Sequence, residues 1–97
     1  MTNCRSEEFG GDLKSANFED TDLTSARLYF CDLAGANLRG ANLQNANLYV
    51  SHLPSANLMD AIGLTDQQVA SACGGPNTAL SAGIQRPQKW DRSGREE

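Results

Sequence analysis

A five-residue period runs from Gly11 to Asp60 and restricts the fold of this chain more than any other feature. Ten consecutive pentapeptides each carry a large apolar residue at the centre and a small residue two positions before it. The centres are Leu13, Phe18, Leu23, Leu28, Leu33, Leu38, Leu43, Leu48, Leu53 and Leu58. Neither a helix of about 3.6 residues per turn nor a strand of period about 2 can place all ten on one face. The period instead predicts a flat-sided coil in which the centre and the small residue point inward.

The repeat, written for example as Ala36-Asn37-Leu38-Arg39-Gly40, resembles the pentapeptide-repeat family, whose consensus is A-[DN]-L-x-x. The resemblance covers residues 11–60, about half of the chain. It implies an all-β solenoid, a right-handed quadrilateral β-helix with four repeats in each coil, so that this segment would form about 2.5 coils. Residues one coil apart then stack, and we expect Asn17, Asn37 and Asn57 to form a side-chain amide ladder between coils.

Both ends of the repeat are predicted to be capped, because a solenoid exposes unpaired backbone at its termini. Residues 1–10 are predicted as an N-terminal cap in which Phe9 covers the first coil. Residues 61–75 are predicted as a C-terminal capping α-helix, with Thr65 as the N-cap and Gln68 completing a capping box. The helix should run from about Asp66 to Cys73 and stop at Gly74-Gly75-Pro76. Residues 76–97 are predicted as an extended tail, disordered from residue 91 onward.

A second resemblance concerns the region after the repeat. The sequences Leu64-Thr65-Asp66-Gln67-Gln68, Ala72-Cys73-Gly74 and Arg86-Pro87 followed by Trp90 resemble a C-terminal extension of many bacterial pentapeptide-repeat proteins. This resemblance implies no particular activity.

Composition limits the classes of partner. The 97 residues carry a net charge of -4, which disfavours direct binding to nucleic acid or to an anionic membrane surface. The start of the chain has no signal-peptide pattern, and no stretch approaches the roughly 20 apolar residues of a membrane span, so we expect a soluble, cytoplasmic protein. Three widely spaced cysteines, Cys4, Cys31 and Cys73, predict unpaired thiols rather than a disulfide framework or a zinc site.

The most informative outward residues are aromatic. Stacking places Tyr29 beside Tyr49 and Phe30 beside Val50, so one side of the coil is apolar, and such a patch is typical of an interface. The predicted protein interface comprises Tyr29, Phe30, Tyr49, Val50 and Trp90. Three occupants are open at this point: the chain's own tail with Leu80, Ile84 and Trp90, a second copy in a homodimer, or another protein partner.

Catalytic chemistry is not indicated. Asp32 and His52 should be neighbours, but no second histidine or nucleophile accompanies them, and we interpret them as a solvated surface pair. Cys31 should point inward. We therefore predict no enzyme, no catalytic, cofactor-binding or metal residues, and no small-molecule substrate.

Two functions from different classes remain. The first is a structural or protein-interaction module. The alternative, implied by the family resemblance, is a DNA mimic that regulates DNA gyrase or another topoisomerase. Duplex DNA carries one charge per about 1.7 Å of its axis. The repeat has six acids against three bases, a balance of -3, which disfavours the alternative.

Overall fold

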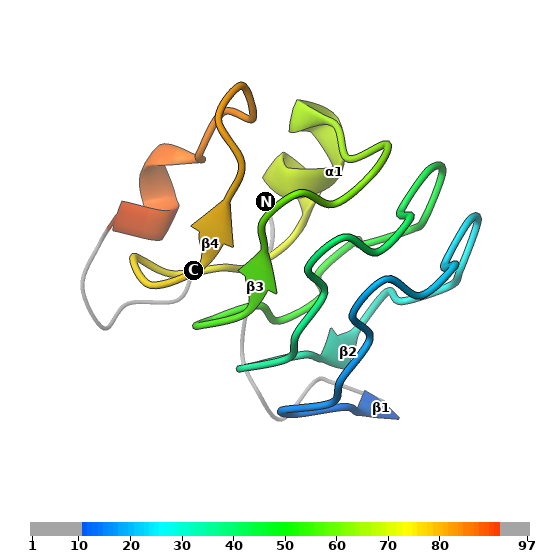
Figure 1. Cartoon of the computed structure of the whole chain (residues 1–97). Helices are drawn as coiled ribbons and strands as arrows, with labels where there is room; N and C mark the ends of the chain where they lie inside the picture. The colour runs from blue at the N-terminus through cyan, green and yellow to red at the C-terminus, as the bar shows by residue number, and fades with distance from the viewer. Residues whose placement is uncertain (1–10, 92–97) are drawn as a thin grey trace.

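Short strands and tight turns make up most of residues 11–91, the part of the chain that the computed structural model describes. The regular elements are β1 (Gly11–Asp12), β2 (Cys31–Asp32), β3 (Asn57–Leu58), α1 (Asp66–Ser71), β4 (Ala79–Leu80) and the 3-10 helix η2 (Gln88–Asp91). β1 pairs in parallel with β2, and β3 with β4. Figure 1 shows the chain rising in layers from β1 and β2 at the bottom to β4 and α1 at the top. No closed sheet forms among the described residues.

Parallel pairing recurs every twenty residues. Single-residue bridges join Asn17 to Asn37, Asp22 to Asn42, Arg27 to Asn47, Asp32 to His52, Asn37 to Asn57 and Asn42 to Ile62. The chain therefore returns to the same side after four pentapeptides, as predicted. We call residues 11–30 layer 1 and residues 31–50 layer 2, and layer 3 begins at Ser51.

The pentapeptide centres form the core, which confirms the inward register. The seven centres from Leu28 to Leu58 are all buried, together with the small residues Ala36, Ala41, Ala46, Ser51 and Ala56. Leu13, Phe18 and Leu23 of layer 1 are only partly buried. Alternating large and small inward residues fill the interior without a helix or a broad sheet.

Each pentapeptide ends in a residue with positive φ. The ten such residues are Ser15, Asp20, Ser25, Phe30, Gly35, Gly40, Asn45, Val50, Ser55 and Asp60. Each precedes the amide that closes a turn onto the pentapeptide centre, as where the Ala16 N–H donates to the Leu13 carbonyl at 3.1 Å. A positive φ at this third turn position is what a type II turn requires. Eight of the ten are Gly, Ser, Asp or Asn, and these short residues adopt this conformation at lower cost than bulky ones.

The prediction that the side-chain amides of Asn17, Asn37 and Asn57 form a hydrogen-bonded ladder between layers is wrong. The Oδ1 atoms of Asn17, Asn37 and Asn57 each accept the N–H two residues later in their own pentapeptide, at 3.0 Å. No hydrogen bond joins one of these amides to another among the described residues. The backbones of the three residues do pair across layers. Their Oδ1 atoms instead satisfy the turn locally, because a short Asx side chain readily reaches its own backbone. Asn37 Nδ2 does reach the neighbouring layer, where it donates to Glu19 Oε1 at 3.4 Å.

Helix α1 begins as predicted and ends earlier. The Thr65 side chain accepts the Gln68 N–H and the Gln68 side chain accepts the Thr65 N–H, so the capping box is confirmed. The helix ends at Ser71, with Ala72 already extended. Cys73 bridges to His52, its N–H donating to the Ser51 carbonyl at 2.7 Å. Pairing with layer 3 thus ends the helix before the glycines are reached.

The paired layers continue beyond the predicted 2.5 coils. Ile62 pairs with Asn42, Cys73 with His52, and β4 with β3. The segment predicted as an extended tail contains the extended strand β4 paired with layer 3, and it departs from extended backbone at η2, where the Trp90 ring is buried. Residues 92–97 lie outside the described part of the chain.

Two of the three cysteines can be placed. Cys31 is a free thiol, as predicted. Cys73 is disulfide-bonded, so the prediction of an unpaired thiol is wrong there; spacing along a sequence does not limit which residues meet in a fold. Cys4 and the predicted N-terminal cap, residues 1–10 with Phe9, lie outside the described residues.

Candidate functional site

Three aromatic side chains meet where layers 1 and 2 turn toward the next layer. The Phe30 ring makes edge-to-face contacts with Tyr29 and Tyr49, with ring centroids 6.3 and 5.7 Å apart. Tyr29 is 45% exposed and Tyr49 is 50% exposed, while Phe30 is half-buried between them. We call these three residues the aromatic corner. Tyr29 and Tyr49 thus both contact the ring of Phe30, which lies between them.

The backbone beneath this corner is strained. Phe30 and Val50 have φ values of 58° and 55°, and they are the two bulky residues among the ten positive-φ positions. An L-residue pays about 1–2 kcal/mol for this conformation. Val50 packs with Cys73 in a small buried cluster, and Phe30 packs against it. That packing, with the aromatic contacts, offsets the strain.

Two of the five predicted interface residues do not face outward. Val50 is buried under Phe30, and Trp90 is 1% exposed. The Trp90 ring lies so close to Gly74 that a Cβ there would come within 2.6 Å of it. Both residues are buried because the chain after α1 returns over the last layer and packs against it. The predicted interface is therefore reduced to Tyr29, Phe30 and Tyr49, and its role as an interface stays a prediction.

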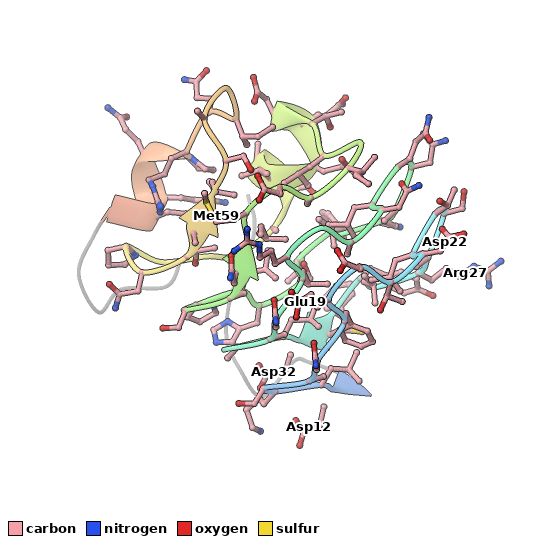
Figure 2. The ribbon with its side chains drawn as sticks, in the orientation of Figure 1. Asp12, Glu19, Asp22, Arg27, Asp32 and Met59 are labelled. Carbon is pink, nitrogen blue, oxygen red and sulfur yellow. The ribbon has the colours of Figure 1, made fainter. Side chains whose placement is uncertain are left out.

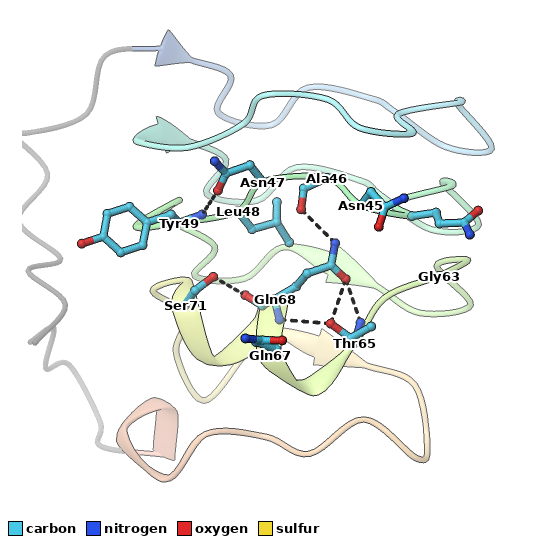
Figure 3. Close-up of a pocket in the computed structure, with 11 residues that line it drawn as sticks. Asn45, Ala46, Asn47, Leu48, Tyr49, Gly63, Thr65, Gln67, Gln68 and Ser71 are labelled. Carbon is cyan, nitrogen blue, oxygen red and sulfur yellow. Dashed lines mark hydrogen bonds between the residues drawn. The ribbon is translucent and has the colours of Figure 1, made fainter.

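A groove of about 660 Å³ lies next to the aromatic corner, between residues 44–49 of layer 2 and residues 63–71 in and before α1. Figure 3 shows Gln68 crossing it from α1 toward layer 2, with Tyr49 at one end. Five of its lining residues are amides: Gln44, Asn45, Asn47, Gln67 and Gln68. None of its lining side chains is charged.

The groove exists because α1 takes the place of a strand. Elsewhere layer 3 pairs with layer 2, as where the Ile62 N–H donates to the Ala41 carbonyl at 2.8 Å. Above Asn47 the chain is helical, and no strand covers this side. The Gln68 Nε2 group substitutes for the missing backbone, donating to the Leu43 and Ala46 carbonyls at 2.8 and 2.9 Å. The sequence predicted Gln68 as a cap but gave no signal for this second role, which depends on where the helix docks.

Asp32 and His52 are paired neighbours, as predicted, and His52 is buried rather than solvated. The expected surface pair is wrong in that respect, because the return of the chain at Cys73 covers His52. The half-buried Cys31 thiol has a pKa raised by burial, which disfavours a reactive thiolate. Within residues 11–91, no three His, Cys, Asp or Glu side chains are grouped so as to hold a metal ion.

The outward charges are dispersed and partly paired. Figure 2 shows Asp12 and Asp32 on a different side from Asp22 and Arg27. Lys14 Nζ lies 3.3 Å from Asp12 and 3.7 Å from Asp32, and Arg39 lies 3.3 Å from Asp60. A hydrogen bond from the Lys14 backbone N–H lowers the pKa of Asp12. The molecule measures 29 × 28 × 21 Å, so these charges do not form a long rod.

Comparison with known proteins agrees with the repeat geometry. A family model described as pentapeptide repeats matches residues 10–40 and 31–62, with eight copies of the repeat. These matches span more than half of the 97 residues. The chain belongs to the pentapeptide repeat family. Searches of curated proteins and of solved structures found no match for this pentapeptide repeat protein.

Membership of the pentapeptide repeat family indicates only a broad class of function. Pentapeptide repeat proteins are generally structural or interaction modules rather than enzymes. None of the helices in residues 11–91 is long and apolar enough to cross a bilayer.

Proposed function

We propose that this pentapeptide repeat protein is a non-enzymatic protein-interaction module and that the aromatic corner is its contact surface. The observation that carries the proposal is the pair of half-exposed tyrosines, held by a phenylalanine whose backbone is strained. Strained bulky residues persist where the surrounding structure and function retain them. Tyrosine is enriched at interfaces because it supplies a large, rigid contact area and a hydroxyl group.

The scaffold we propose is a right-handed quadrilateral β-helix. Support comes from the twenty-residue spacing of the bridges, the ten turns of similar geometry and the family match. Such a scaffold holds Tyr29 and Tyr49 on consecutive layers, with the Phe30 N–H donating to the Tyr49 carbonyl at 3.0 Å. A contact surface fixed in this way loses little conformational entropy when it binds.

The occupant of the corner is proposed to be a second copy or another protein. The tail was the third alternative, but Leu80, Ile84 and Trp90 pack against the main core. Within the described residues, the tyrosines therefore remain exposed and available for a partner.

The proposal can be tested with Tyr49→Glu, which places a charge in the corner. Its matched control is Ile62→Glu, because Ile62 is 56% exposed and lies in another column of the fold. Light scattering after size exclusion should show a dimer for wild type and Ile62→Glu, and a monomer for Tyr49→Glu, if the occupant is a second copy. If all three are monomers, affinity purification from the source cells should recover a protein that Tyr49→Glu alone fails to bind. Complexes unaffected by Tyr49→Glu would refute the proposal.

The DNA-mimic alternative receives less support. A mimic of duplex DNA needs a regular line of unpaired negative charge. Here Asp12, Asp32 and Asp60 lie beside Lys14 or Arg39, and the molecule is short. A DNA gyrase supercoiling assay that shows inhibition or protection would favour this alternative over the interaction module.

A further inference from the structure

Layer 1 ends in an unpaired backbone edge. In layer 2, the residue before a pentapeptide centre directs both its N–H and its C=O toward layer 1: Asn37 donates to the Ala16 carbonyl at 2.9 Å and accepts the Phe18 N–H at 2.7 Å. In the proposed β-helix, the equivalent residues of layer 1 lie one on each side of the coil, and all are exposed: Asp12, Asn17, Asp22 and Arg27. Within residues 11–91, nothing pairs with their backbone N–H and C=O groups. We call these four residues the open edge.

The apolar residues at this end of the core are only partly covered. Leu13, Phe18 and Leu23 are half-buried, whereas every pentapeptide centre from Leu28 onward is buried. At the opposite end, β4 pairs with β3 and the Trp90 ring is buried. Among the described residues, layer 1 has no such cover. An unpaired edge beside half-covered apolar side chains is a template for pairing with another chain.

Arg27 departs from the rest of the repeat at this edge. Eight of the ten residues that precede a pentapeptide centre are Asp or Asn, and in all eight the Oδ1 atom accepts the N–H two residues later. Arg27 cannot form this bond, and it makes no ion pair with the other residues that the structure describes. Figure 2 shows its side chain pointing away from the coil. An exposed guanidinium in this position is suited to a carboxylate of a partner.

The open edge is complementary to a second copy of itself. If two copies meet layer 1 to layer 1 about a two-fold axis, their edges run antiparallel, and opposite residues can exchange both backbone hydrogen bonds. An axis through two sides of the coil would place Arg27 opposite Arg27 of the second copy, or aspartates opposite aspartates, and like charges directly opposite are destabilising. An axis through two corners places Arg27 opposite one aspartate and Asn17 opposite the other. Only the corner axes therefore pair opposite charges.

The aromatic corner distinguishes the two corner axes. The chain turns there from the side that carries Arg27 to the side where β2 lies on β1, which carries Asp12. An axis through this corner brings the exposed Tyr29 rings of the two copies together and sets Arg27 opposite Asp12. The other corner axis would set Arg27 opposite Asp22 and would keep the two aromatic corners apart. Contact between the two apolar corners favours the first axis.

The other acids of layer 1 do not oppose this arrangement. The Glu19 carboxylate accepts a hydrogen bond from Asn37 Nδ2 of layer 2 at 3.4 Å. The Asp20 carboxylate lies beside Gly40, also in layer 2. Both side chains thus point away from the open edge, so they add little repulsion between two copies.

We propose that a second copy of this chain docks end to end on the open edge, about a two-fold axis at the aromatic corner, with Arg27 opposite Asp12 of the second copy. The proposal rests on the proposed β-helix and interaction function, and it assigns the aromatic corner to a second copy. Asn17 then lies opposite Asp22 of the second copy, where its amide can donate to the carboxylate. The contact pairs the open backbone groups and covers three half-buried side chains in each copy, Leu13, Phe18 and Leu23.

A charge exchange in the full chain tests this contact. Light scattering after size exclusion should show a dimer for wild type and a monomer for Arg27→Asp, with the dissociation constant raised at least about tenfold. Adding Asp12→Arg to Arg27→Asp should restore the dimer, because opposite charges face each other again. The matched control adds Asp22→Arg instead, on the same edge, and should remain a monomer. All three positions are exposed, so the melting curves should stay close to that of wild type. Rescue by Asp22→Arg in place of Asp12→Arg would overturn the proposed axis.

Hydrogen exchange shows whether the open edge is covered. The amides of Asn17 and Asp22 should exchange more slowly in the wild-type dimer than in monomeric Arg27→Asp. A monomeric wild type with slow exchange at these amides would assign the edge to the chain's own residues 1–10 and overturn the proposal. A monomeric wild type with fast exchange would overturn it as well.

The outcomes separate this proposal from the interaction function on which it rests. If wild type is a monomer and Tyr49→Glu abolishes a complex with another protein, the interaction function stands and the end-to-end dimer fails. If the charge exchange controls a dimer that Tyr49→Glu leaves intact, the end-to-end dimer stands and the aromatic corner fails as the contact surface.

Discussion

The Gln68 side chain connects the capping helix to layer 2 through hydrogen bonds. The substitution Gln68→Glu tests that connection. Its Oε1 accepts the Thr65 N–H at 2.8 Å, while its Nε2 donates to the Leu43 and Ala46 carbonyls. Gln68→Glu keeps the shape of the side chain and the capping acceptor, because Glu also serves in a capping box. It replaces the donating NH₂ group by an oxygen that faces two carbonyl oxygens.

The expected cost follows from those two bonds. Each is worth about 0.5–1.5 kcal/mol net, so their loss lowers the free energy of unfolding by about 2 kcal/mol. For a domain of this size, the melting temperature should fall by roughly 8–16 °C. Repulsion between the introduced carboxylate and the carbonyls raises the pKa of that carboxyl above about 4.3. Its protonated form can donate to one carbonyl, so the deficit should shrink as the pH falls below that raised pKa and grow as the pH rises.

The assay is urea unfolding followed by circular dichroism, at neutral pH and near pH 4, with wild type measured in parallel. Gln67→Glu is the matched control, because it adds the same charge to the same first turn, where a negative charge is favourable. It should leave stability within about 0.5 kcal/mol of wild type. If Gln68→Glu is as stable as wild type at neutral pH, the Nε2 group does not bind the two carbonyls and this account of the capping helix is wrong.

Other substitutions test the core and the thiols. Leu38→Asp should abolish cooperative folding because it buries an unpaired charge, whereas Gln44→Ala should melt like wild type; a cooperative melt of the first would contradict the inward register. Gly74→Ala should lower the free energy of unfolding by about 1–3 kcal/mol, because the added methyl group would overpack against the buried Trp90 ring. The added methyl group of Gly75→Ala meets nothing closer than 3.9 Å, so this variant should lose less stability in the same urea assay. Burial raises the pKa of Cys31, so iodoacetamide should modify it more slowly in the folded protein than in urea at pH 8; equal rates would refute its burial. The same shift means that stability falls as the pH rises through the usual range of the thiol.

Sequence patterns predicted the features of this fold that depend on interactions between residues close together in the chain. The five-residue period placed Leu38 and the other centres inside, and Thr65 with Gln68 marked where α1 begins. The same reasoning failed where a distant segment competes. Ala72 ends the helix because Cys73 pairs with layer 3, and no pattern within α1 contains that information.

The candidate site shows the same division. The twenty-residue echo of Tyr29 in Tyr49 and of Phe30 in Val50 predicted one apolar, aromatic side, since stacking follows directly from the period. Nothing in the period excluded Trp90, which is apolar and lies beyond the repeat, yet the ring is buried against Gly74. The groove could not be predicted, because it depends on the direction in which α1 leaves the layer.

The sequence by itself determined which residues face inward, where the turns fall and which residues stack, because a strict period repeats the same local geometry. Only the tertiary structure decided how the repeat ends. There the period is lost, and Cys73, β4 and Trp90 take their places by pairing and packing with segments about twenty or more residues away. Long-range contacts of that kind depend on the shape of the last complete layer, which is formed only once the chain has folded.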